Sequence, residues 1–396
     1  MIVHLCYGAI TEHICINIKI NIIKHPMAGI DRTPASTIRL LNDEPLAHIM
    51  LGHRELFHSN LLAWFFRFIP NAADQVFCSL TTNTCTQSEA VREVHREKNN
   101  LDLLFRWPGH DPLVIENKVF SLPDERQLKE YSVKAKKSGE NPAFWLLSLS
   151  DPGWIGGRKE LDGCVWQWLS YKELAERILD SLDQEDFSYP NETMRHYALV
   201  IDLLSELVQG VVVNNSSDMV GLSSHLKIVL GDDRLISSMS KLRAQSVAKR
   251  VSQALETAGI VETEVESALT NALPLNSWFT TLAGISNIQA GWQLQGDQFR
   301  LAIITPHLAG RSEASRQDRF AFAKANEYLF DFSYLDKVLG TEDLKVKPLP
   351  GAANPLGFNR YDPDFIYRYK LTPNITVAQL EIAAITIARR TLKSSN

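Results

Sequence analysis

Residues 101–120, LDLLFRWPGHDPLVIENKVF, constrain the fold of this chain more than any other passage. Two apolar runs, LDLLFRW and LVIENKVF, flank the turn-forming sequence Pro-Gly-His-Asp-Pro, which predicts two neighbouring strands of one sheet. Charged side chains interrupt both runs, with Asp102 in the first and Glu116 and Lys118 in the second. A charged pair inside so apolar a strand requires a physical reason, because burying unpaired charge is unfavourable.

The strand period of two places these charges together. Successive side chains point to opposite faces, so Glu116 and Lys118 share one face while Ile115 and Asn117 share the other. If the two strands form a hairpin, Asp102 approaches Glu116 across it. Two adjacent carboxylates repel each other unless a hard cation lies between them, and Mg²⁺ accepts one or two carboxylates as its protein ligands. This pattern predicts a metal site at which Lys118 orients or helps to deprotonate a water molecule.

The sequence around this hairpin predicts one α/β unit over residues 37–210. Residues 46–69 carry an apolar helical stripe that ends at Pro70, and residues 124–139 begin with acidic residues and end with lysines, as the helix dipole favours. The expected order is helices at 46–69 and 72–80, strands at 91–97, 101–107 and 113–120, a helix at 124–139, a strand at 144–150, a strand leading into a helix over 164–182, and a helix at 191–211.

The run VVVNNSSD predicts a change of unit, because Asn and Ser cluster there between helical patterns. The 396 residues suggest two domains, so we expect a second α+β domain over residues 211–396. Its predicted elements are helices at 226–231, 234–259, 316–334 and 376–393, with β structure at 292–307 and 365–372. Residues 1–36 form an N-terminal extension. Its run ICINIKINII suits an edge strand, and a true start at Met27 is an equal alternative.

Composition excludes several classes of protein. With 45% hydrophobic and 22% charged residues the chain matches a globular protein, and disorder along its whole length is excluded. The formal net charge of −5 provides no overall basic field for non-specific binding of nucleic acid. Five cysteines without CxxC or Cys/His spacing suggest neither a disulfide framework nor a zinc site and favour the cytoplasm. No apolar run approaches a membrane span, and we expect no signal peptide.

Asp102 followed by Glu116, Asn117 and Lys118 resembles the D…(D/E)-x-K signature of the PD-(D/E)XK nuclease superfamily. Glu55, in GHRELFHSNLLAWFF, is similar to the acidic residue that many members carry on the first core helix. The proline of the family name is absent, since a leucine precedes Asp102, and this weakens only the motif match. The resemblance covers residues 45–205.

A further element lies on the helix after the second strand of the hairpin. Gln127 and Tyr131, in QLKEY, resemble the Q-x-x-x-Y element that some members carry on that helix, and their i, i+4 spacing puts both on one helix face. Lys129 on the same helix is a candidate phosphate contact. Within the superfamily the chain looks most like a bacterial subgroup that combines such blocks with a further C-terminal half.

The resemblance implies a restriction-endonuclease-like core, a mixed central sheet flanked by helices, and hydrolysis of DNA phosphodiester bonds with Mg²⁺, for which Mn²⁺ substitutes. It implies a role in defence against phage or foreign DNA, or in DNA repair. By position, the implied metal-binding groups are the side chains of Asp102, Glu116 and Glu55 and the backbone carbonyl of Asn117. Lys118 then serves the nucleophile, and Gln127, Tyr131 and Lys129 contact the substrate.

Other interpretations stay open. Glu116 and Lys118 can form an ion pair on an exposed strand face, Glu55 can pair with a neighbouring arginine, and Gln127 and Tyr131 can lie on a solvated helix face. The alternative function is a catalytically silent module that keeps the fold and binds nucleic acid or a partner protein. We expect a homodimer or a partner protein at the C-terminal domain, because one site cuts one strand and a duplex break is most easily made by a dimer.

Overall fold

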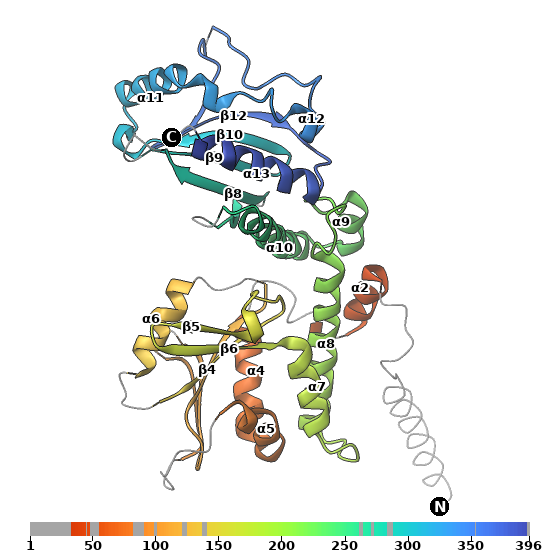
Figure 1. Cartoon of the computed structure of the whole chain (residues 1–396). Coiled ribbons are helices and arrows are strands. Elements are labelled where there is room, and N and C mark those ends of the chain that lie inside the picture. Colours follow the sequence, from red (N-terminus) through yellow and green to blue (C-terminus); the bar gives the residue numbers. More distant parts are fainter. Residues whose placement is uncertain are drawn as a thin grey trace, which may run out of the picture.

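The computed structural model describes residues 33–44, 46–47, 55–81, 91–98, 101–120, 125–136, 141–260, 264–270, 273–282, 288–352 and 354–393. Two six-stranded sheets, one in each half of the chain, organise this part of the protein (Figure 1). The predicted strand in ICINIKINII and the alternative start at Met27 lie outside the described residues.

The first sheet contains β1 (Glu93–Lys98), β2 (Leu101–Arg106), β3 (Leu113–Lys118), β4 (Ala143–Ser148), β5 (Arg158–Leu161) and β6 (Cys164–Ser170). Its strand order is β1-β2-β3-β4-β6-β5, with the predicted meander of β1, β2 and β3 antiparallel and with β3, β4 and β6 parallel. All residues of β3 except the last, Lys118, are buried. β5 was not predicted, because its sequence RKEL lacks an apolar alternation.

Helices cover both faces of this sheet. They are α2 (Pro34–Asp43), α4 (Glu55–Phe68), α5 (Pro70–Phe77), α6 (Glu125–Lys136), α7 (Tyr171–Ser181) and α8 (Tyr189–Val211), and a 3₁₀ turn spans Cys78–Leu80. Residues of α4, α5, α7 and α8 share a hydrophobic core with Leu103 and Ile115. α6 packs on the opposite face, where Leu128 joins Val114. A sheet covered on both sides explains why β3 is almost wholly apolar.

The second sheet is antiparallel throughout, with the order β11-β12-β10-β9-β8-β7. Its strands are β7 (Glu266–Thr270), β8 (Leu273–Thr281), β9 (Gln289–Gln295), β10 (Gln298–Ile304), β11 (Asn359–Tyr361) and β12 (Phe365–Leu371). The helices of this half are α9 (Ser224–Leu230), α10 (Asp233–Thr257), α11 (Glu313–Ala325), α12 (Asp336–Leu339) and α13 (Val377–Lys393). Two 3₁₀ turns span Pro306–Leu308 and Glu327–Phe330. The fold class is therefore the predicted one, a mixed α/β unit followed by a second unit of sheet and helices.

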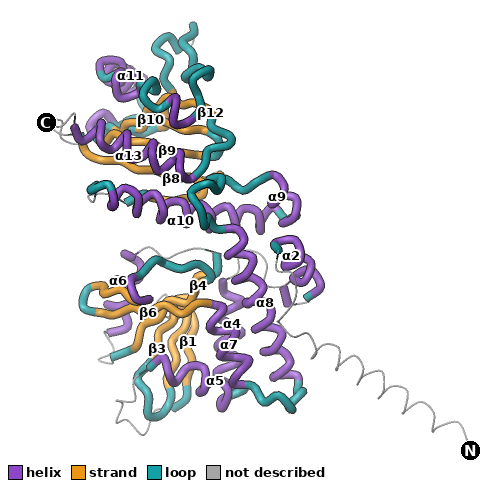
Figure 2. Tube along the Cα trace, turned by 45° about the vertical axis from the view of Figure 1, so that its right-hand side comes forward, coloured by secondary structure: helices purple, strands orange, loops and turns teal. Residues whose placement is uncertain are grey.

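The long helix α10 lies between the two sheets (Figure 2). Its first half contributes Leu235 and Met239 to the core of the first unit, and its second half contributes Val247 and Val251 to the core of the second. The two cores therefore meet along one helix, and the division of the chain after residue 210 stays a prediction. Among the described residues no helix combines the length and the apolar character that a membrane span requires.

Candidate active site

Pairing of β2 with β3 brings the two predicted carboxylates together. Leu103 lies opposite Ile115 and Leu104 opposite Val114, so one further step of this register places Asp102 opposite Glu116. The backbone N–H of Asn117 donates to Asp102 Oδ2 at 2.8 Å. This hydrogen bond fixes the Asp102 carboxylate beside β3.

Glu116 and Lys118 lie on the same face, as the strand period predicts. The ammonium nitrogen of Lys118 is 2.8 Å from Glu116 Oε1, and the two side chains are 13% and 1% exposed. This is not an ion pair on an exposed strand. With both carboxyl groups ionised, the buried second oxygen, Glu116 Oε2, accepts no hydrogen bond from the part of the chain that the structure describes, and a hydrogen bond between Glu116 and Asp102 requires a proton on one of them. A buried carboxylate with an unsatisfied oxygen is unfavourable unless another group completes its environment.

The electrostatics of Glu116 reflect this crowding. Burial, together with the charge of Asp102, raises the pKa of Glu116 to about 8, although the Lys118 ammonium acts in the opposite direction. Both causes disfavour the charged form of the carboxyl group. A cation bound here would favour the ionised form of both carboxylates.

The helix α6 carries two further predicted residues, which contact each other. Gln127 Nε2 donates to the Tyr131 hydroxyl at 2.5 Å. Burial raises the pKa of Tyr131, and the nearby charge of Glu116 raises it further. Tyr131 is only 7% exposed, so it does not lie on a solvated helix face. Lys129 points elsewhere, because its ammonium lies 3.8 Å from Asp162 Oδ1 in an exposed ion pair.

Behind β3 a buried polar network holds Asn117, which is fully buried. Its side-chain amide donates to Ser59 Oγ at 3.0 Å, and its side-chain oxygen accepts from the Tyr171 hydroxyl. Ser59 belongs to α4 and Tyr171 begins α7, so this amide links the strand to two helices. Ser59 and Tyr171 were missed by the sequence analysis, although polar residues within the apolar runs HSNLLAW and VWQWLSY were a usable signal.

Replacing Asn117 with alanine is expected to lower the free energy of unfolding by about 2–4 kcal/mol, because it leaves two buried hydroxyl groups without this partner. Chemical denaturation measures the change. In a Tyr171→Phe background the same substitution is expected to be less destabilising, since one of the two hydroxyls is then absent. Equal losses in both backgrounds would show that Tyr171 and Asn117 are not coupled.

The predicted metal-binding groups are placed only in part. The helix α4 begins at Glu55, whose side chain lies outside the described part of the protein. Within that part, no group of three or more His, Cys, Asp or Glu residues suited to a metal ion occurs. Asp102 and Glu116 form a pair, and one or two carboxylates are the usual protein ligands of Mg²⁺. Together with the unsatisfied Glu116 Oε2, this donor set fits a hard divalent cation.

Comparison with known proteins agrees with this geometry. A family model described as the PD-(D/E)XK nuclease superfamily matches residues 46–198, which include the meander, α6 and the start of α8. No curated protein and no solved structure matches the chain. The matched segment contains Asp102, Glu116 and Lys118 and all the strands of the first sheet. Residues 46–198 of this chain are therefore similar to the PD-(D/E)XK nuclease superfamily, and the match includes the strands that carry the paired carboxylates and Lys118.

Proposed function

We propose that the N-terminal unit hydrolyses phosphodiester bonds of DNA with a bound Mg²⁺ ion. The observation that carries this proposal is the buried Glu116 carboxylate, which lies beside Asp102 with one oxygen unsatisfied and the Lys118 ammonium 2.8 Å from the other. Two carboxylates and one ammonium at the end of a strand form a minimal set of groups for phosphoryl chemistry. The superfamily match supplies independent support for a nuclease.

Each predicted residue then has a role. Asp102 and Glu116 hold the cation, with Glu55 and the backbone carbonyl of Asn117 as further ligands. Such a cation supplies a Lewis acid that activates water and neutralises phosphate charge. The Lys118 ammonium lies at the same point and offsets the negative charge that develops on the phosphate in the transition state.

Residues of α6 position the substrate in this proposal. Tyr131 and Gln127 are already hydrogen-bonded to each other, and the charge of Glu116 acts on the Tyr131 hydroxyl, so they present one preorganised polar pair to a nucleic-acid strand. Lys129 contributes a phosphate contact if its exposed ion pair opens, and such a pair contributes little stability.

The proposal also names a cellular location, a biological role, a second usable metal and a partner for this activity. We place it in the bacterial cytoplasm, in defence against phage or foreign DNA or in DNA repair, with Mn²⁺ able to replace Mg²⁺. The C-terminal unit, residues 211–396, provides contacts to a partner protein or to a second copy of the chain. A dimer would place two sites on one duplex.

A digestion assay with the full chain tests the proposal. Plasmid and single-stranded DNA are incubated with Mg²⁺, Mn²⁺ or EDTA, beside an Asp102→Ala/Lys118→Ala double variant and an exposed control, Asp180→Ala/Lys227→Ala. We expect cleavage that requires the metal and is lost only in the first variant. If the wild-type protein is inert on both substrates with either metal, the silent-module alternative replaces the nuclease; equal activity in both variants indicates contamination or another site.

A further inference from the structure

A cavity of about 940 Å³ opens on the C-terminal unit, between the start of α11 and residues 354–362. It lies in the second unit, and the proposed nuclease chemistry does not use it. Its lining combines cationic and aromatic side chains, among them Arg311, Phe320, Arg360 and Tyr361. The kind of ligand that fits this cavity depends on which of these side chains are already held by hydrogen bonds or ion pairs within the protein.

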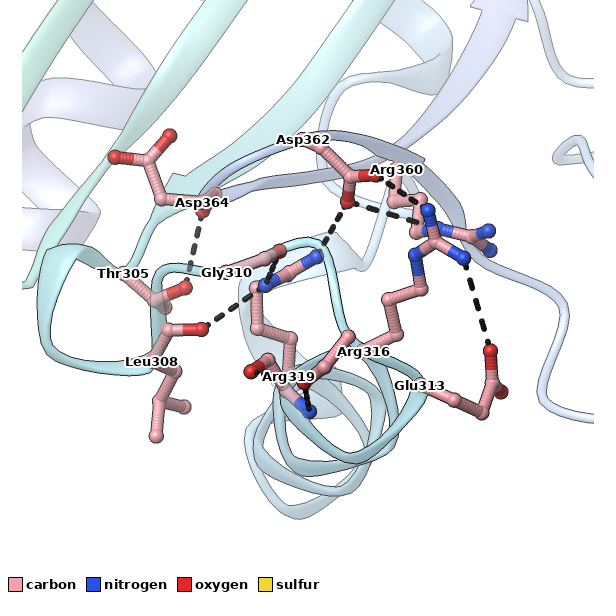
Figure 3. A network of polar contacts seen from close by, with 11 residues as sticks. Thr305, Leu308, Gly310, Glu313, Arg316, Arg319, Arg360, Asp362 and Asp364 are labelled. Carbon is pink, nitrogen blue, oxygen red and sulfur yellow. Dashed lines mark hydrogen bonds and ion pairs between the residues drawn. The ribbon is translucent and has the colours of Figure 1, made fainter.

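Asp362 holds the polar network beside this cavity (Figure 3). Its two carboxylate oxygens accept hydrogen bonds from Arg316 Nη2 at 2.9 Å and from Arg319 Nη2 at 2.6 Å. Arg319 is fully buried and also donates to the backbone carbonyls of Leu308 and Gly310. The Asp362 carboxylate is thus neutralised within the fold by two fixed arginines.

Two other arginines face the cavity with their charge less committed. Arg360 Nε is 3.8 Å from Asp362 Oδ1, beyond hydrogen-bond distance, and the Arg360 side chain is 37% exposed. Arg311 is exposed just before α11. Three arginines of this network, Arg316, Arg319 and Arg360, pair with the carboxylates of Asp362 and Glu313. Arg311 also lines the cavity, so these six side chains together carry a net charge of +2. The cavity therefore attracts an anion.

An aromatic ring completes the lining. Tyr361 on β11 is 74% exposed although its neighbours pack in a sheet. An exposed ring next to the guanidinium groups of Arg311 and Arg360 suits a ligand that has both a flat apolar face and negative charge. Nucleic acid has both, because its bases stack on aromatic rings and its phosphates bind arginine.

The same sheet face continues the aromatic surface beyond the cavity. Tyr361 pairs with Phe365, and Tyr367 and Tyr369 follow on the same face of β12 at steps of two. These three rings are half-buried, with centroids 5.6 and 6.3 Å apart, and Phe279 of β8 lies 6.0 Å from Phe365. The opposite face is the buried core face, which packs with α10 and α13. The Arg300 guanidinium lies 4.5 Å from the centroid of the Tyr367 ring, so this row combines rings with a positive charge. Rings beside a guanidinium group suit unpaired bases and the phosphates that join them.

We propose that the C-terminal unit binds a single strand of nucleic acid here, with a base on the Tyr361 ring and backbone phosphates at Arg311 and Arg360. Further bases then follow the rings of β12. The identity of the ligand rests on the proposed nuclease function. The site gives that nuclease a second surface, separate from Asp102 and Glu116, that holds an unpaired strand. The whole chain has a net charge of −5, so it lacks an overall positive field that would bind nucleic acid. Binding then depends on a local cluster of arginines such as this one.

Binding of a labelled strand tests this inference without cleavage. The full chain is titrated in EDTA against fluorescein-labelled oligothymidylate of about 20 nucleotides, longer than the about 4–16 nucleotides that one such module covers. We expect Tyr361→Ala to weaken binding about 5-fold to 100-fold and Tyr361→Phe to restore it, because stacking requires the ring and not the hydroxyl. Arg311→Ala/Arg360→Ala is expected to reduce the slope of log K against log salt by about 1.4.

Matched controls are Tyr189→Ala and Arg389→Ala, which remove an exposed tyrosine and an exposed arginine elsewhere. If the Tyr361 and arginine variants bind as the wild type does, the inference is wrong. Binding of labelled polyglutamate that the Tyr361 and arginine variants weaken, without binding of the labelled strand, would assign the cavity to an acidic protein partner and also overturn the inference. If the nuclease proposal alone is wrong, the protein binds the labelled strand through Tyr361 but does not cleave DNA when metal is added.

Discussion

Replacing Lys118 with alanine is expected to lower the rate of DNA cleavage about 10²–10⁴-fold while the protein stays folded. The Lys118 ammonium is 2.8 Å from Glu116 Oε1, with which it forms an ion pair. Removing it takes away the group that offsets charge on the phosphate, so the loss is expected in kcat more than in KM. Single-turnover cleavage of a labelled oligonucleotide measures the effect.

Two further variants separate chemistry from folding. Lys118→Met keeps the length of the side chain without its charge, so it is expected to be as inactive as Lys118→Ala. Lys227→Ala removes an exposed lysine of α9 and is expected to cleave normally. Circular dichroism and thermal unfolding report whether each variant is folded. A folded Lys118→Ala protein that cuts within about threefold of the wild-type rate would leave Lys118 a structural partner of Glu116 and no more.

The hairpin that carries the candidate site could be predicted because its information is local. Alternation fixes the shared face of Glu116 and Lys118, and a short turn sets Asp102 beside them. The i, i+4 spacing of Gln127 and Tyr131 likewise predicts their contact on one helix face, and they are hydrogen-bonded. In these cases the residues that matter are close in sequence or joined by one turn.

The support behind the site could not be predicted, because it depends on tertiary packing. Asn117 meets Ser59 and Tyr171 across 58 and 54 residues, distances that no local period encodes. The edge strand β7 was missed for another reason, since the sequence ESALT at Glu266–Thr270 has little apolar character. The shared helix α10 shows the same limit, because one amphipathic pattern does not tell which of two cores each turn contacts.

Replacing Glu116 with glutamine is expected to make the metal-free protein more stable at alkaline pH. The pKa of Glu116 is raised from 4.5 to about 8, so the unfolded chain loses this proton at a lower pH than the folded chain does. Stability of the wild type therefore falls as pH rises from 4.5 towards 8, and the glutamine variant lacks this loss. Between pH 5 and pH 8 we expect the difference in unfolding free energy to shift by about 2–4 kcal/mol in favour of the variant.

Urea denaturation in EDTA at both pH values gives this shift as a difference of differences, so packing changes that do not depend on pH cancel. Adding Mg²⁺ at pH 8 is expected to raise the stability of the wild type and not that of Glu116→Gln, because the ionised carboxylate is the form that holds a cation. The pH dependence tests whether the pKa of Glu116 is raised, and the effect of Mg²⁺ tests whether Glu116 binds the cation. A constant difference between pH 5 and pH 8 would show that Glu116 is ionised in the folded protein throughout, whereas equal stabilisation of both proteins by Mg²⁺ would place the cation away from Glu116.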